Sequence, residues 1–373
     1  MSPSRVSRIT RELIDAGVLD GLHDEPPERP GRPTQHLRLR ADAAVTIGVE
    51  AGGGQTRLVA CDAHGEAIAE DVRREGGPID RALLDRLVRR VKAFVAKHRL
   101  PEPAGVGAAL HHVVTSDGHW QPKEHGGGSV PARRILEERL DVPVRVDDVS
   151  RAFADAEHRF GAGRNAPDML YLFLGRDGVG SGIFADGNLI RSRTGICGEI
   201  GHVSVRPDGE RCRCGNVGCL ETLATHEALI AHAEAYLAQG VDSELRPGAT
   251  FSRFTEAARR GDKVATLVVH ELNEHLARAL TSAISVTGAT TIVLGGDVRA
   301  TGDTLPNLLS ETLRMRLLRP LGKRLHVTYA ALPANAGARG AAVGVLDDIL
   351  RDGSLVRRRL PRARPGEEAP MRR

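Results

Sequence analysis

The stretch Gly198–Glu221 decides the fold of this chain. Its sequence is GEIGHVSVRPDGERCRCGNVGCLE. Four side chains with metal-ligating atoms lie close together in it: His202, Cys212, Cys214 and Cys219. One imidazole and three thiolates supply the four tetrahedral ligands of a closed structural zinc site. Three of the five cysteines of the chain gather here, so a zinc site is favoured over an ordinary loop with free thiols.

Two carboxylates, Glu199 and Glu221, flank these four ligands. A closed site of three cysteines and one histidine needs no carboxylate. We therefore expect both side chains to be free to face a ligand outside the metal site.

The order of these residues resembles the signature of the ROK family of repressors, open reading frames and sugar kinases. The signature is E-x-G-H followed by C-x-C-G-x-x-G-C-x-E. The resemblance implies an α/β chain with the two-lobed actin-like (ribonuclease H-like) sugar kinase fold, a structural Zn²⁺ and a homodimer. It also implies that Glu199, His202 and Glu221 contact sugar hydroxyls. It extends from about Ser4 to about Leu350, and the zinc loop carries most of its specificity.

Length and composition exclude several classes of protein. A chain of 373 residues is long enough for two lobes with additions. Aromatic residues make up only 3%, too few for the stacking platforms that bind single-stranded nucleic acid. No apolar run approaches the roughly 20 residues that span a bilayer, and no signal peptide follows Met1. Clustered cysteines of metal-site type fit a reducing compartment, so we expect a cytoplasmic protein.

The N-terminal segment predicts an amphipathic helix over Ser4–Ala16, ended by Gly17 and followed by a strand at Gln35–Leu39. This order resembles the back half of the winged helix of ROK repressors, whose wing ends in Gly-Arg-Pro. The resemblance implies operator DNA as a partner. It assigns the DNA contacts to the basic and polar side chains of the helix: Arg5, Ser7, Arg8 and Arg11. A solvated amphipathic helix is the alternative.

The helices that precede a recognition helix in a winged helix do not appear in this sequence. Two alternatives remain open for this head. Either the true start lies upstream of Met1, or the head is truncated and binds DNA poorly.

Three glycine-rich segments resemble the nucleotide loops of sugar kinases. Their glycines are Gly52 and Gly53, Gly178 and Gly180, and Gly295 and Gly296. Family kinases carry Asp-x-Gly-Gly-Thr-Lys in the first loop, whereas this chain has Glu50 in place of the Asp and lacks the Thr and the Lys. In the second loop Asp177 replaces a threonine, and its charge would repel phosphates. We therefore expect impaired binding of ATP and Mg²⁺.

The general base of the kinases belongs to a family motif, P-V-x-V-E-N-D-A-N-A, that resembles Pro143–Ala152 here. In this register Val149 occupies the base position, and valine cannot accept a proton. Asp148 occupies the preceding position, where the family has an asparagine, and we expect it among the sugar-binding residues. It is the fallback base, and it would serve only if the strand end slipped by one residue.

These features predict four segments. A partial winged-helix head covers 1–40, an N-terminal actin-like lobe 44–150, a C-terminal lobe with the zinc loop 151–350, and a basic disordered tail 351–373. We expect a sugar-responsive transcriptional regulator, with an ATP-dependent hexose kinase as the alternative. A sugar-binding remnant with neither activity is a third possibility. The sequence does not identify the sugar or sugar derivative.

Overall fold

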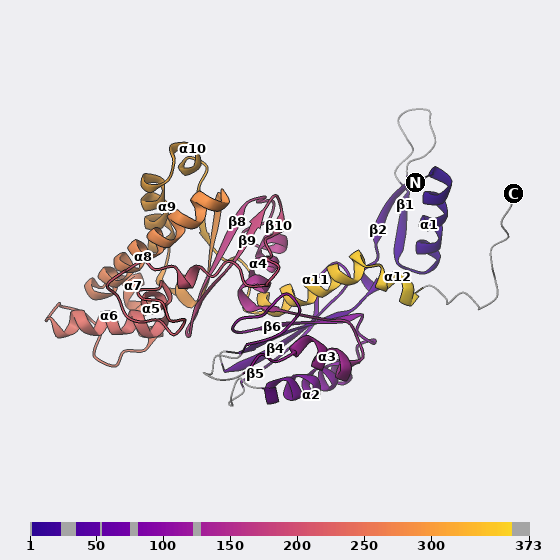
Figure 1. The fold of residues 1–373 in the computed structure, drawn as a ribbon, viewed down its shortest axis with the longest axis horizontal. Coiled ribbons are helices and arrows are strands. Elements are labelled where there is room, and N and C mark those ends of the chain that lie inside the picture. The colour runs from indigo at the N-terminus through magenta and orange to yellow at the C-terminus, as the bar shows by residue number, and fades with distance from the viewer. Residues whose placement is uncertain (1, 24–34, 53, 75–80, 122–127, 360–373) are drawn as a thin grey trace.

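A computed structural model describes residues 2–23, 35–52, 54–74, 81–121 and 128–359. They form two lobes and a small head that projects from the first lobe (Figure 1). In this part of the chain no helix is both long and apolar enough to cross a membrane.

The head consists of one helix and one hairpin. Helix α1 covers Pro3–Asp15, and strand β1, Leu19–His23, pairs antiparallel with β2, Gln35–Leu39. Gly17 ends the helix with a φ of +67°, a conformation that glycine adopts without strain. The segment Gly31-Arg32-Pro33, which precedes β2 and resembles the Gly-Arg-Pro end of the family's wing, lies outside the described residues.

The first lobe is built on a five-stranded mixed sheet with the order β5-β4-β3-β6-β7. Its strands are β3 Thr46–Gly52, β4 Gln55–Cys61, β5 Ala67–Arg74, β6 Gly105–Leu110 and β7 Val144–Asp148. Helices α2, Arg81–His98, and α3, Ala132–Leu140, cover one face of the sheet (Figure 1). β3 and β6 are buried along almost their whole length because helix α11, Ala336–Arg351, covers the other face.

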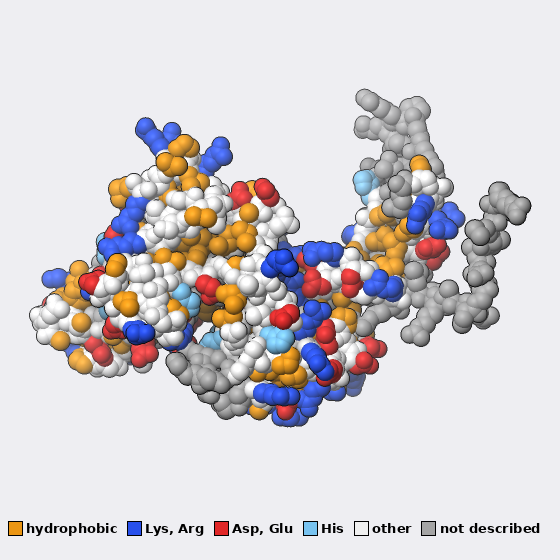
Figure 2. Space-filling view, viewed as in Figure 1, with side chains coloured by type: hydrophobic (Ala, Val, Ile, Leu, Met, Phe, Trp, Pro, Cys, Tyr) orange, Lys and Arg blue, Asp and Glu red, His pale blue; other side chains and the backbone are white. Residues whose placement is uncertain are grey.

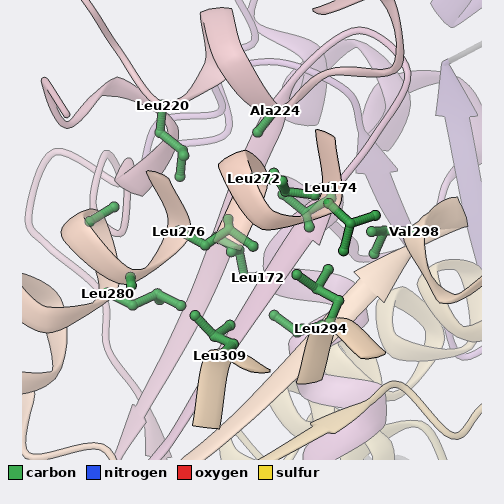
Figure 3. Packing of buried hydrophobic residues seen from close by; sticks show 14 of the residues in the cluster. Leu172, Leu174, Leu220, Ala224, Leu272, Leu276, Leu280, Leu294, Val298 and Leu309 are labelled. Carbon is green, nitrogen blue, oxygen red and sulfur yellow. The ribbon is translucent and has the colours of Figure 1, made fainter. Parts of the chain in front are cut away.

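The second lobe repeats this plan with the order β10-β9-β8-β11-β12. Its strands are β8 Met169–Leu174, β9 Val179–Ala185, β10 Asn188–Leu189, β11 Thr291–Gly296 and β12 His326–Tyr329. The helices are α5 Glu221–Ala224, α6 His226–Ala238, α7 Phe251–Arg260, α8 Lys263–Thr287, α9 Thr304–Arg316 and α10 Arg319–Gly322. Figure 3 shows Leu272, Leu276 and Leu280 of α8 packed in one cluster with leucines of β8 and β11. This cluster is the larger of the two main cores.

Two helices join the lobes. α4, Val149–Phe160, begins directly after β7, and α11 packs against both α4 and the first sheet. α11 approaches the sheet so closely that a Cβ on Gly107 would lie 1.9 Å from the Ala341 carbonyl oxygen. Gly107 of β6 therefore has no room for a side chain against α11.

The C-terminal end of α11 contacts the base of the head. Val345, Leu346 and Ile349 form one buried cluster with Ala43 and Ala44, and Leu39 at the end of β2 packs against it. Helix α12, Ser354–Arg359, adds the buried Leu355 to the same cluster. The prediction of a disordered tail from residue 351 is thus wrong for 354–359, because Leu355 has a core to join, and residues 360–373 lie outside the described part.

Candidate functional site

The four predicted metal ligands lie together. Their ligand atoms are all within 4.8 Å of one another, with 3.7 Å from His202 Nδ1 to Cys212 Sγ and 3.6 Å between the sulfurs of Cys214 and Cys219. A tetrahedral ion with metal–sulfur bonds of about 2.3 Å places its sulfurs about 3.8 Å apart. The cluster therefore fits a tetrahedral metal ion.

Residues 202–219 form a compact loop, here called the knuckle, and its backbone explains how the four candidate ligands meet. Short bridges pair Ser204 with Cys219 and Arg211 with Val217, so the segment folds back on itself. Gly218 has a φ of +67°, and a Cβ there would lie 1.6 Å from the Arg206 carbonyl oxygen. Only glycine allows this return to the metal cluster.

A cleft of about 1130 Å³ lies between the two lobes, and Figure 2 shows the molecule hollowed there. It brings together all the predicted sugar contacts: Asp148, Glu199, His202 and Glu221. Glu50 of the first lobe and Asp177 of the second also line it. The predicted residues thus converge on one cleft, although they come from different lobes.

Glu221 is not free, contrary to the expectation from the sequence. One carboxylate oxygen lies 2.6 Å from Arg213 Nη2, and the other accepts a hydrogen bond from the Val179 N–H at 3.0 Å. Arg213 also donates to the Asp177 carbonyl oxygen at 2.8 Å. Glu221 and Arg213 therefore fasten the metal knuckle to the glycine turn between β8 and β9.

Burial shifts the pKa values of two further carboxyls of the cleft, Asp148 of the first lobe and Glu199 of the second. Burial raises the pKa of Asp148 to about 6, opposed by the Arg151 guanidinium and reinforced by the Glu199 carboxylate. Burial also raises the pKa of Glu199, opposed by His202. Asp148 caps α4 by accepting from the Ser150 N–H at 2.8 Å. Both carboxylates line the cleft, where their oxygens can accept hydrogen bonds from ligand hydroxyls.

Val149 packs into an apolar cluster with Ala109, Ala152 and Ala341. It is the first residue of α4, and only 4% of it is exposed. No proton acceptor therefore stands at the predicted base position, and Asp148 keeps the position before it.

The glycines of the predicted nucleotide loops pack against other parts of this chain. A Cβ would lie 2.3 Å from the His111 ring at Gly52, 2.8 Å from Glu221 at Gly178, and 2.1 Å from the Ser150 hydroxyl at Gly180. At Gly295 and Gly296 it would meet Tyr171 and the Leu174 carbonyl. Gly53 lies outside the described residues. Close internal packing thus requires these glycines.

Several residues of the site escaped the sequence-based predictions. Arg213 stands between two cysteine ligands, a place that fixes its backbone and could have marked it as a contact residue. Asp147 and Arg151 are four apart, a spacing typical of a helix-side ion pair. Nothing in the sequence points from Asp147 to Arg191, which pairs with it from the other lobe.

The predicted DNA contacts all lie exposed on α1: Arg5, Ser7, Arg8 and Arg11. Figure 2 shows Lys and Arg side chains over this helix. Arg8 lies 3.7 Å from Glu12, and no residue of α1 is buried.

Comparison with known proteins places these features in context. The ROK family model matches residues 46–347. The chain is 26% identical to the DNA-binding transcriptional repressor Mlc of Escherichia coli, covering 96% of this chain and 89% of that one. It is 29% identical to the transcriptional dual regulator NagC of the same species, and the match covers 89% of this chain and 82% of that one.

Two solved structures are similar in fold. A ROK family transcriptional regulator, a homolog of E. coli Mlc, superposes with a TM-score of 0.84 at 25% identity, covering 96% of this chain and 92% of that one. A ROK family glucokinase from Streptomyces griseus, in complex with glucose and AMPPNP, superposes with a TM-score of 0.66 at 28% identity. The match covers 80% of this chain and 98% of that one.

The fold and the cleft define a two-lobed, actin-like protein of the sugar kinase type with an added N-terminal head. The family match spans most of the chain, and the metal knuckle carries its signature. The chain belongs to the ROK family.

Proposed function

We propose that this chain is a ROK-type transcriptional regulator that binds operator DNA through its head and a sugar or sugar derivative in the interlobe cleft. The observation that carries the proposal is the residue at the general-base position, Val149. The base position is filled by a buried valine, whereas the residues that would contact a sugar still line the cleft. Such a cleft can bind its ligand without transferring a phosphoryl group.

The head supports the DNA part of the proposal. The repressor Mlc matches 96% of this chain, whereas the glucokinase structure matches 80%. The exposed arginines of α1 suit phosphate and base-edge contacts, and no acidic residue lies in its first turn. In a homodimer, two such heads would meet two operator half-sites.

The metal knuckle supports the ligand part. We assign Zn²⁺ to it, because one imidazole and three thiolates make a closed structural set. A bound zinc ion would hold the knuckle rigid. His202 would bind the metal through Nδ1, which lies 3.7 Å from Cys212 Sγ, and its side chain also lines the cleft together with Glu199. Sugar binding would favour one lobe arrangement and so change the spacing of the two heads.

An ATP-dependent hexose kinase is the second candidate. The Asp148 carboxyl favours it, since a pKa of about 6 suits a general base near neutral pH. Its role as the cap of α4 opposes it, because the side chain is committed to the Ser150 N–H.

A coupled ADP-release assay separates the two candidates. With Mg-ATP and a panel of glucose, N-acetylglucosamine, N-acetylmannosamine and xylose, we expect turnover no higher than sugar-free ATP hydrolysis. Loss of a general base alone costs roughly 10²–10⁴-fold. Val149→Asp tests whether a base at this position restores activity, and Val149→Asn is its matched control without a base. Sugar-dependent turnover of the unmodified chain, lost in Asp148→Asn, would establish the kinase instead.

A further inference from the structure

Asp147, one residue before the capping Asp148, is a buried carboxylate that binds three arginines. It is 6% exposed. Oδ1 lies 2.6 Å from Arg151 Nε, and Oδ2 lies 3.1 Å from Arg145 Nη2 and 2.6 Å from Arg191 Nη2. The first oxygen also accepts the Asp148 N–H at 2.9 Å. Each of the two carboxylate oxygens thus accepts from two donors.

The three arginines come from three parts of the fold. Arg151 lies on α4 and also donates to the Val114 carbonyl. Arg191 follows β10 in the second lobe and begins the loop that leads to Glu199 in the cleft. Arg145 lies on β7, and its Nη1 donates to the Gly344 carbonyl at 3.0 Å and to Asp348 at 3.2 Å, both on α11.

The α11 end of this network reaches the head. Asp348 and Gly344 flank Val345 and Leu346, and Ile349 follows one residue later. Those three apolar side chains form the buried cluster with Ala43 and Ala44, against which Leu39 of β2 packs. In Figure 1, α11 runs from between the lobes to the base of the head. A continuous set of contacts therefore joins the cleft loop to the segment that carries α1.

We propose that Asp147 is a positioning residue that couples residues 190–199 to α11 and, through it, to the head. This inference rests on the proposed function for its biological meaning, since the cleft loop would sense the ligand and the head would bind DNA. The physical basis is the shared oxygen. Arg191 and Arg145 bind the same Oδ2, so displacement of Arg191 changes how firmly that oxygen holds Arg145. Arg145 in turn anchors α11.

Hydrogen exchange of the full chain tests the coupling without DNA or sugar. Arg191→Gln removes the cleft-loop contact but leaves Asp147 with two arginines, so the fold is retained. We expect amide exchange at least tenfold faster both in 190–199 and in 344–351, with faster exchange also at 36–45. Arg193→Gln is the matched control. Arg193 is exposed in the same loop, and its side chain pairs with no residue in the described ranges; this variant should leave 344–351 unchanged.

The reverse substitution supplies the second arm. Coupling is reciprocal, so Arg145→Gln, which frees α11, should also accelerate exchange in 190–199. Exchange that changes only near the substituted residue, or nowhere, in either variant overturns the proposal. A coupled response in a chain that binds no operator DNA would leave the coupling standing and refute the regulator function, so the two failures are distinguishable.

Discussion

Replacement of Cys219 by serine is expected to abolish stoichiometric binding of zinc. Cys219 is fully buried, and its sulfur lies 3.6 Å from that of Cys214. A structural zinc site contributes roughly 10–16 kcal/mol in zinc-finger peptides, and removal of one of four ligands loses a large part of it. Elemental analysis of the purified protein should find about one zinc per chain in the unmodified protein and almost none in the variant. Cys197→Ser, a change at a cysteine outside the cluster, is the matched control.

The same variant should loosen the cleft. Arg213 lies between two metal ligands, and it holds both Glu221 and the Asp177 carbonyl. Without the metal, we expect rapid proteolysis within 206–218 and faster amide exchange at 175–179. Full zinc content in Cys219→Ser, or an unchanged 175–179 segment after zinc loss, would contradict the assigned role of the knuckle.

Glu50→Gln is expected to stabilise the protein above neutral pH. Burial raises the pKa of Glu50 to about 7 from an ordinary 4.5, with partial opposition from Arg57 and the Ala338 N–H. Glu50 Oε2 is buried and finds no hydrogen-bond partner in the described part of the chain. The folded state therefore holds the proton more tightly than the unfolded state does. Stability attributable to this group is complete below about pH 4.5 and falls as pH rises to about 7.

The size of this effect follows from the shift. A difference of about 2.5 pKa units corresponds to about 3 kcal/mol. The free energy of unfolding of Glu50→Gln, minus that of the unmodified chain, should grow by this amount between pH 4.5 and pH 8 in urea titrations. The solvent-exposed Glu138→Gln provides the control and should show no such trend. A difference that stays constant with pH would mean that Glu50 is not a strained, buried acid.

The sequence predicted that His202 and the three cysteines gather in one place, because these residues are close along the chain. His202 and the three cysteines needed only a few tight turns to meet, and the glycines for those turns stand beside them. The two-lobed fold and its family also followed from the knuckle signature and the glycine loops. The convergence of Asp148, Glu199, His202 and Glu221 on one cleft was expected from the family resemblance.

Ion pairs between residues that lie far apart along the chain could not be predicted from the sequence. The engagement of Glu221 by Arg213 depends on how the knuckle folds back onto the β8–β9 turn. The pairing of Arg191 with Asp147 crosses between lobes, and no local periodicity reports it. Likewise, α12 is a short, arginine-rich helix that forms because Leu355 joins a cluster built by α11 and the base of the head. Tertiary burial, not local propensity, decides such elements.

The most direct test of the account is selection of bound sequences from a pool of random DNA duplexes by the full-length chain. We predict enrichment of one sequence with two related half-sites, and loss of binding when Arg5, Arg8 and Arg11 are replaced by alanine. We also predict that at least one sugar of the kinase panel changes the affinity for the enriched duplex. Failure to enrich any sequence, with the zinc site loaded and the sugars absent or present, would contradict the conclusion that this chain is a sugar-responsive regulator.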